Sequence, residues 1–345
     1  MRGDTSGRAI ARFLVAAFLC FCVVGEAVAS ETPAGPVVSL AFVGDIMLDG
    51  IPGDTFKAGR DPFADFARIL DAADIRIGNL ECVIASRGRP ERKPFTFRAN
   101  PYWVNVLKGH FTALSLANNH TGDFGRDAFS EMLDLLEAQK LSYFGGGRNL
   151  AEAHAPLLIE RNGLRIALLG YNEIFPRSFE ADHAAPGLAW SEDEQVIADI
   201  VNARRLHHAD LVIPFMHWGI EHEHHASARQ RRLAHAMIDA GANAVIGGHP
   251  HVTQDIEQYK GRPIFYSLGN FVFDGFKDED NNTGWLARLE VDRSGVHRWQ
   301  IYVARTDRQG IPHPASPKPR SCWQRGQPIK TVCGDSGVAD NKASE

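Results

Sequence analysis

Histidine, carboxylate and amide side chains occur where several short apolar runs of this sequence end. These run ends are Gly44-Asp45-Ile46-Met47, Gly78-Asn79-Leu80-Glu81, Ala117-Asn118-Asn119-His120, Met216-His217-Trp218-Gly219, Gly247-Gly248-His249-Pro250-His251 and Gly269-Asn270-Phe271. Imidazole nitrogen with carboxylate and amide oxygen is the ligand mixture that Zn, Mn or Fe ions accept. Because no serine or cysteine nucleophile lies among these groups, the pattern favours a metal centre over a nucleophilic triad.

One or two divalent ions could use these groups, and two ions about 3.5–4 Å apart would share a carboxylate and activate a water. The residues that we expect to be metal ligands are Asp45, Glu81, Asn119, His217, His249 and His251. His120 is a candidate general acid beside the centre, and Glu221 a candidate on the substrate side. Each motif alone also fits a turn or a loop, so the prediction depends on their joint occurrence.

Other histidines are dense in the sequence but less well placed. His222, His224 and His225 follow a motif among acidic residues, which favours a solvated loop. His207-His208 ends a predicted helix and His235 lies on a helix face, so we expect structural or exposed positions for them.

The elements that would position the motifs follow a βα rhythm, which is typical of an α/β protein. Apolar runs span residues 37–43, 74–78, 112–116, 164–170, 210–215, 244–246 and 263–268, and helical patterns span 62–72, 103–108, 126–139, 193–207 and 228–240. After Gly284 the residues alternate, which predicts antiparallel strands at a sheet edge. Since ligands bind at the carboxyl ends of strands in open α/β sheets, this arrangement would bring the run ends together.

Composition bounds the class of protein. The chain has 345 residues, 44% of them hydrophobic and 23% charged, which is enough to bury a full core. The net charge of -5 and the scattered basic residues argue against a nucleic-acid partner. We predict one domain over residues 37–308 and a loosely ordered, proline-rich tail over residues 309–345.

The N-terminus has the features of an export signal. Arg2, Arg8 and Arg12 precede an apolar run over residues 13–24, and Ala27-Val28-Ala29 is a small-residue cleavage pattern. We therefore expect a signal peptide over residues 1–29 and an extracytoplasmic location, in the periplasm or at the cell surface. The alternative is a retained membrane anchor, although the run is shorter than the roughly 20 residues that span a bilayer.

Three cysteines would remain after removal of that segment, an odd number for an oxidising compartment. We expect a disulfide between Cys322 and Cys333, because both lie in the proline-rich tail. Cys82 is either a thiolate ligand next to Glu81 or a small buried residue at a strand end.

The run ends belong to an ordered set of motifs between residues 39 and 273. This set also includes Asp123-Phe124-Gly125, Ile220-Glu221 and Tyr266-Ser267-Leu268. In this set the chain resembles the CapA family of capsule and poly-gamma-glutamate synthesis proteins, whose fold is similar to that of calcineurin-type metallophosphoesterases. The resemblance implies a four-layer αββα sandwich, like that of metallo-dependent phosphatases, with the metals at the strand ends. It also implies that Asp45 is the first-motif aspartate and that Glu81 lies near the bridging carboxylate.

One position departs from the phosphoesterase pattern. Where those proteins place a histidine two residues after the first aspartate, this chain has Met47, whose thioether binds hard divalent ions poorly. The number of ions, one or two, therefore stays open.

Two functions follow from the motifs and the resemblance. The first is an exported, metal-dependent hydrolase of capsule or poly-gamma-glutamate biosynthesis, in which a metal-activated water attacks a phosphoester or a gamma-glutamyl amide. The alternative is a non-catalytic polymer-handling or anchoring component of a capsule assembly complex. The resemblance implies an anionic cell-surface polymer or its precursor as a partner, and a membrane capsule-synthesis complex as a second one.

Overall fold

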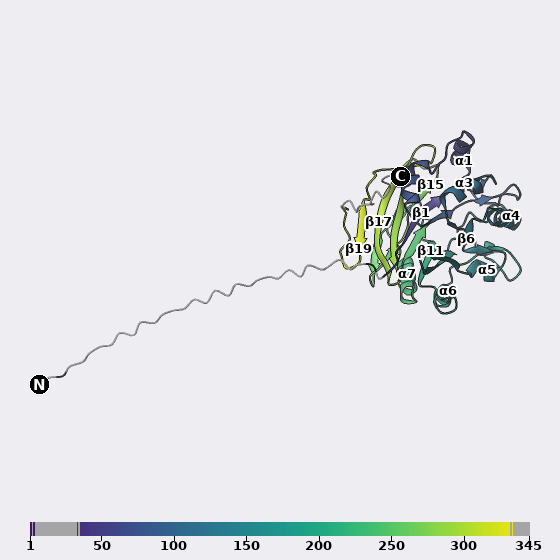
Figure 1. Ribbon diagram of the computed structural model, residues 1–345. Helices are drawn as coiled ribbons and strands as arrows, with labels where there is room; N and C mark the ends of the chain where they lie inside the picture. The colour runs from purple at the N-terminus through teal and green to yellow at the C-terminus, as the bar shows by residue number, and fades with distance from the viewer. Residues whose placement is uncertain (2, 4–32, 34, 332, 334–345) are drawn as a thin grey trace, which may run out of the picture.

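The computed structural model describes residues 1, 3, 33, 35–331 and 333. The predicted signal peptide, residues 1–29, lies outside the described residues except for positions 1 and 3. No helix in the described part of the chain is both long and apolar enough to cross a membrane. Figure 1 shows the folded part as two packed β-sheets with helices on the outside.

The first sheet has nine strands in the order β18-β17-β16-β1-β2-β5-β6, with β15 beside β1 and β19 beside β17. The strands are β1 (Val38–Ile46), β2 (Ile75–Leu80), β5 (Ala113–Ser115), β6 (Ser142–Phe144), β15 (Asn270–Val272), β16 (Thr283–Asp292), β17 (Gly295–Thr306), β18 (Pro312–Pro314) and β19 (Ser321–Gln324). Strands β1, β2, β5, β6 and β15 are parallel, and β16 to β19 are antiparallel. The alternation after Gly284 is therefore confirmed as antiparallel structure.

The second sheet has six strands in the order β13-β14-β12-β11-β9-β8. They are β8 (Leu157–Arg161), β9 (Leu164–Asn172), β11 (Leu211–His217), β12 (Val245–Gly248), β13 (Ile256–Tyr259) and β14 (Arg262–Phe265). The four central strands are parallel and the two outer ones antiparallel. Two small sheets join β3 (Val83–Ile84) to β4 (Arg98–Ala99) and β7 (Gly146–Gly147) to β10 (Gly187–Leu188).

The described residues form four layers, helices, sheet, sheet and helices, with an apolar core between each pair of neighbouring layers. The central core joins the two sheets and includes Phe42, Phe215 and Trp299, all fully buried. The outer cores join the first sheet to α2, α3 and α4, and the second sheet to α6 and α7. These helices are α2 (Ala67–Asp71), α3 (Trp103–His110), α4 (Gly125–Ala138), α6 (Asp193–Arg205) and α7 (Ala228–Asp239). The expected four-layer αββα sandwich is confirmed.

Most predicted elements form within a few residues of their expected bounds. The elements that the patterns did not predict are short and include α1 (Gly50–Lys57), α5 (Leu150–His154), the 3-10 turn η2 (Arg177–Phe179) and the strands β6, β8 and β13. The predicted helix over residues 62–72 forms as the 3-10 turn η1 (Ala64–Phe66) followed by α2. Helix α1 contains two glycines and a proline, so its composition does not favour a helix.

The prediction that the chain is loosely ordered from residue 309 is wrong for much of that segment. Strands β18 and β19 both pair with β17, and Trp323 lies opposite Trp299 and packs on the central core. Proline is compatible with an edge strand, which explains why Pro312 and Pro314 are accommodated. The predicted disulfide between Cys322 and Cys333 is present.

Candidate metal centre

The run ends of both sheets meet at one edge of the sandwich. Asp45 is the last residue but one of β1, Glu81 directly follows β2 and Asn119 follows β5, all from the first sheet. His217 ends β11 and His249 directly follows β12 in the second sheet. Because these strands are parallel, their carboxyl ends bring residues that are far apart in the sequence into one cluster.

Close backbone packing requires glycine next to the cluster. A Cβ on Gly248 would lie 2.6 Å from an Asp45 carboxylate oxygen, and one on Gly247 would lie 2.1 Å from a backbone oxygen. The next residues are strained, since His249 has φ 96° and His251 has φ 58°. Left-handed backbone at non-glycine residues costs of order 1–3 kcal/mol and is typically found at functional sites.

Two carboxylates form the acidic part of the cluster, and both are fully buried. Asp45 is well supplied with donors, because Asn79 Nδ2 donates to its Oδ1 at 2.8 Å and the His249 N–H donates to its Oδ2 at 3.2 Å. In contrast, neither carboxylate oxygen of Glu81 accepts a hydrogen bond from any described residue. A buried carboxylate without donors is costly unless a cation compensates it.

Imidazoles surround this carboxylate. Glu81 Oε1 lies 3.5 Å from His217 Nε2 and 3.8 Å from His251 Nε2. His217 Nε2 also lies 2.7 Å from Asn119 Oδ1, and the rings of His217 and His249 are 4.9 Å apart between centroids. The Nδ1 atom of His249 is buried and has no hydrogen-bond partner among the described residues.

These groups form sets with the spacing of metal ligands. Within each set, the ligand atoms all lie within 4.8 Å of one another. The sets are Glu81 with His217 and His249, Asp45 with Glu81 and His251, and Glu221 with His249 and His251. Glu81 belongs to the first two sets, as expected of a carboxylate shared between two ions. The unpartnered oxygens of Glu81 and the mixed nitrogen and oxygen donors fit a divalent transition-metal ion.

Burial sets the protonation of the cluster. It raises the pKa of Asp45, and together with the charge of Asp45 it raises the pKa of Glu81 well above its usual value. Burial and the neighbouring histidines lower the pKa of His217 well below its usual value and that of His249 to about 3. His217 and His249 are therefore neutral near pH 7, which is the form that binds metal.

Comparison with known proteins places the chain in a family. Residues 39–275 match the family described as bacterial capsule synthesis protein PGA_cap. The chain belongs to this capsule synthesis family. It is 35% identical over 277 residues to the PGA biosynthesis protein CapA of Bacillus subtilis, covering 79% of this chain and 72% of that protein.

A second relative agrees with this assignment. The chain is 39% identical over 246 residues to the capsule biosynthesis protein CapA of Bacillus anthracis, covering 69% of this chain but only 60% of that protein. Among solved structures, Thermus thermophilus sulfate thiohydrolase SoxB is similar at a TM-score of 0.45 and 11% identity, covering 80% of this chain and 57% of that one. Haemophilus influenzae NAD nucleotidase is similar at a TM-score of 0.42 and 11% identity, covering 81% and 60%.

In this capsule synthesis protein, the structure brings all six predicted ligands into one cluster. Glu221 is exposed, yet its carboxylate reaches the same imidazoles as the buried acids. His222, His224 and His225 are exposed and belong to none of the ligand sets found among the described residues. Cys82 is a free, buried thiol outside these sets.

His120 lies beside the cluster and is held by a buried acid. Its Nδ1 is 2.8 Å from Asp123 Oδ2, and Lys93 pairs with the other Asp123 oxygen. Lys93 Nζ also donates to the Asn119 carbonyl at 2.8 Å. Burial lowers the pKa of His120, although the hydrogen bond and charge of Asp123 oppose this effect. His120 belongs to none of the ligand sets found among the described residues, and its role as an acid stays a prediction.

Sequence reasoning did not select several residues that shape the centre. Asn79 Nδ2 contacts Asp45 and lies 3.2 Å from His217 Nδ1, and Asn118 Nδ2 donates to Asn79 Oδ1 at 3.1 Å. Asn270 Oδ1 lies 2.8 Å from His251 Nδ1 and so orients that ring. These three residues occur within the quoted motifs, so the signal was present. Lys93 lies in a loop without such a signal.

Met47 does not face the cluster through its sulfur. The side chain is 1% exposed and packs in the core between the first sheet and its helices. Its sulfur accepts a hydrogen bond from the Asp49 N–H at 3.2 Å. The position held by histidine in the phosphoesterase pattern thus has a packing role here.

Proposed function

We propose that this chain is an exported, metal-dependent hydrolase of capsule or poly-gamma-glutamate biosynthesis. Membership of the capsule synthesis family and the relatives named for such biosynthesis support the biological context. The N-terminal basic and apolar pattern supports export. The metal-dependent chemistry is supported by the buried cluster at the strand ends.

One observation carries the proposal: the Glu81 carboxylate is fully buried and its two oxygens have no donor among the described residues. Removal of a charged group from water without compensation costs several kcal/mol. A divalent ion held by Glu81 would provide that compensation. The neutral imidazoles of His217 and His249, whose pKa values are lowered by burial, are suited to share the same ion.

The residues divide into holding, acid and substrate roles. Asp45, Glu81, Asn119, His217, His249 and His251 would hold one or two ions of Mn, Zn or Fe. A bound ion would supply Lewis-acid chemistry and an activated water for attack on a phosphoester or a gamma-glutamyl amide.

His120 would donate a proton to the leaving group from Nε2, because the Asp123 carboxylate accepts from Nδ1. This step uses the imidazolium form, which the hydrogen bond and charge of Asp123 favour and burial opposes. Asn79 and Asn270 would orient the ligands, and Glu221 would line the substrate side.

The experiment combines metal analysis with two chemical probes. We expect metal in purified wild-type protein, and loss of both metal and turnover of bis(p-nitrophenyl) phosphate or gamma-glutamyl p-nitroanilide in His217→Ala and His249→Ala. His235→Ala is a matched control, because this histidine stacks on Tyr259 away from the cluster. Wild-type metal content in both cluster variants would refute the site. Metal without turnover of either probe would refute the hydrolase assignment for these bond types.

A further inference from the structure

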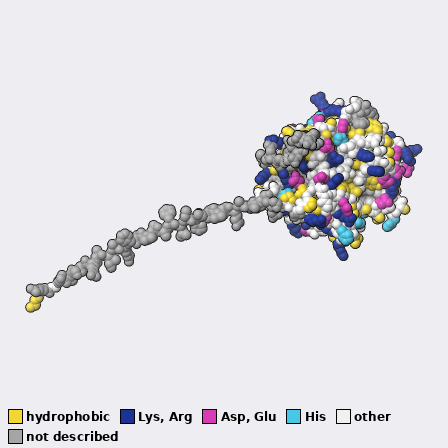
Figure 2. Space-filling view, in the orientation of Figure 1, with side chains coloured by type: hydrophobic (Ala, Val, Ile, Leu, Met, Phe, Trp, Pro, Cys, Tyr) yellow, Lys and Arg dark blue, Asp and Glu magenta, His cyan; other side chains and the backbone are white. Residues whose placement is uncertain are grey.

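A basic loop lies next to the candidate metal centre. Residues 87–93, which we call the basic loop, contain Arg87, Arg89, Arg92 and Lys93 and a single acid, Glu91. This concentration contrasts with the whole chain, whose net charge is -5. Figure 2 shows basic and acidic side chains interspersed over the face in view, so the chain as a whole has mixed surface charge.

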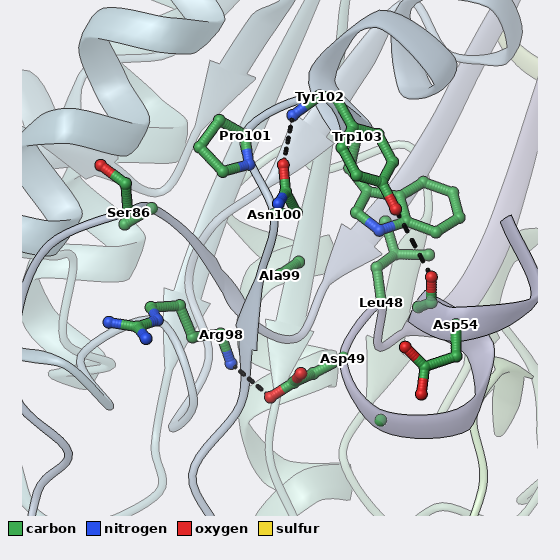
Figure 3. A pocket seen from close by; sticks show the side chains of 13 residues that line it. Leu48, Asp49, Asp54, Ser86, Arg98, Ala99, Asn100, Pro101, Tyr102 and Trp103 are labelled. Carbon is green, nitrogen blue, oxygen red and sulfur yellow. Dashed lines mark hydrogen bonds between the residues drawn. The ribbon is translucent and has the colours of Figure 1, made fainter. Parts of the chain in front are cut away.

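The fold holds the ends of this loop in place. Strands β3 and β4 pair with each other and close the loop between them. In β4, on the C-terminal side of the loop, the Arg98 N–H donates to Asp49 Oδ2 at 2.8 Å beside a separate pocket of about 340 Å³ (Figure 3). At its start, the Arg87 N–H donates to Glu131 Oε2 at 3.0 Å. The loop is therefore anchored to α4 and to the segment after β1.

A cavity of about 350 Å³ lies between the basic loop and the segment of residues 176–188. Glu91, Arg92 and Lys93 line it on the loop side, and Arg126 and Phe179 line it on the other side. Asp123, which pairs with Lys93, also lines it. Asn119 also lines it, and its Oδ1 lies 2.7 Å from His217 Nε2 of the metal cluster. A ligand in the cavity would therefore lie next to the candidate centre.

Two of the three cations at this cavity lack an acidic partner. Arg92 is exposed and makes no hydrogen bond or ion pair with any described residue. Arg126 donates to backbone carbonyls of residues 178, 180 and 186, and no described acid pairs with it. Only Lys93 is neutralised, by the buried Asp123. The three cations outnumber the two acids of the lining, Glu91 and Asp123. Guanidinium groups bind carboxylates well, so the cavity can accept an anion.

The wall of the cavity limits the kind of anion. Pro176, Phe179 and Leu188 give it an apolar side opposite the basic loop. A chain that alternates carboxylates with methylene groups could place its hydrocarbon part on this wall and its charges on the guanidinium groups. A polyphosphate has no hydrocarbon part to bury there.

We propose that this cavity is a binding subsite for a carboxylate-bearing polymer chain, with Arg92 as the exposed contact and Arg126 as the fixed one. The subsite delivers the neighbouring bond of the chain to the metal centre through the shared wall at Asn119. This inference rests on the proposed function, which supplies the polymer context, but it makes a separate prediction about where the polymer binds.

The test measures anisotropy of a fluorescein-labelled gamma-glutamate oligomer at physiological ionic strength. We expect Arg92→Glu to weaken binding about fivefold or more, because a favourable charge pair becomes a repulsive one. Arg92→Lys keeps the charge and should lose less. Arg89→Glu makes the same charge change in the same loop but outside the cavity lining, and should have a smaller effect. Arg161→Glu, at the opposite end of the second sheet, should leave binding unchanged.

Three results would overturn the subsite: no binding by the wild-type protein, equal weakening by Arg89→Glu and Arg92→Glu, or equally strong competition by polyphosphate of the same charge. Metal content measured on the same samples keeps the two proposals apart. Arg92→Glu should retain wild-type metal, whereas His217→Ala should lose metal and still bind the oligomer. If the wild-type protein binds the oligomer but holds no metal, the metal centre is refuted and the subsite is not.

Discussion

Replacing Glu81 by glutamine keeps the shape of the side chain and removes its charge. In the metal-free protein this carboxyl is fully buried, and its oxygens have no donor among the described residues. Its raised pKa, caused by burial and by Asp45, means that its ionised form is disfavoured in the fold. Metal-free Glu81→Gln should therefore be as stable as the wild type or up to about 2 kcal/mol more stable, because an uncompensated buried acid is removed.

With metal bound, the wild type should instead be more stable than Glu81→Gln. An ion present at 100 times its Kd stabilises the wild-type fold by about 2.7 kcal/mol. In a domain of this size that free energy corresponds to a rise in Tm of roughly 5 °C. Glu81→Gln should show less than a third of this rise, because the shared carboxylate of two ligand sets is lost.

Differential scanning fluorimetry with and without added Mn²⁺ measures both effects. Asp199→Asn is the matched control, since Asp199 is a buried acid that accepts hydrogen bonds from Tyr171 and Gln195 at 2.9 and 2.7 Å. It should destabilise the metal-free protein by about 1–3 kcal/mol and leave the metal-induced rise unchanged. A full metal-induced rise in Glu81→Gln, or a metal-free Glu81→Gln destabilised as much as Asp199→Asn, would refute the reasoning.

Three further predictions concern pH, the acid and the tail. Between the pKa of Glu81 in the unfolded chain and its raised pKa in the fold, the metal-free fold keeps a proton that the unfolded chain has lost, so the stability of the metal-free protein should fall as pH rises. Bound metal should instead be lost as pH falls, which equilibrium dialysis measures. Metal content independent of pH would contradict this prediction. Asp123→Asn should lower turnover of whichever probe is cleaved by about 10²-fold or more with metal content unchanged, because His120 loses its partner; an equal loss of metal would instead indicate a structural role. Cys322→Ser should lower the free energy of unfolding by about 2–4 kcal/mol, because the disulfide to Cys333 is lost. Chemical denaturation of the variant and of the oxidised wild type measures this difference. Equal free energies of unfolding would show that strand pairing alone holds β19.

Sequence patterns predicted most of the fold because each signal is local. The run over residues 37–43 is apolar and β-branched, and β1 forms there. Helix α7 begins at a capping box in which Ser227 and Gln230 satisfy each other's backbone donors. The prediction of a loosely ordered tail after residue 309 was wrong, because the order of this segment comes from pairing with β17 and from burial of Trp323. Neither of these is a local property of the sequence.

The sequence by itself determined which residues could bind a metal, because imidazole, carboxylate and amide groups at strand ends have few other roles in such numbers. Only the tertiary structure decided how they combine. The packing of the two sheets face to face places His217 beside Glu81, which are far apart in the chain. It leaves that carboxylate buried without a donor among the described residues. The same packing turns the Met47 sulfur to a backbone N–H and sets Arg92 beside the centre, because side-chain direction and loop position depend on neighbours from other elements.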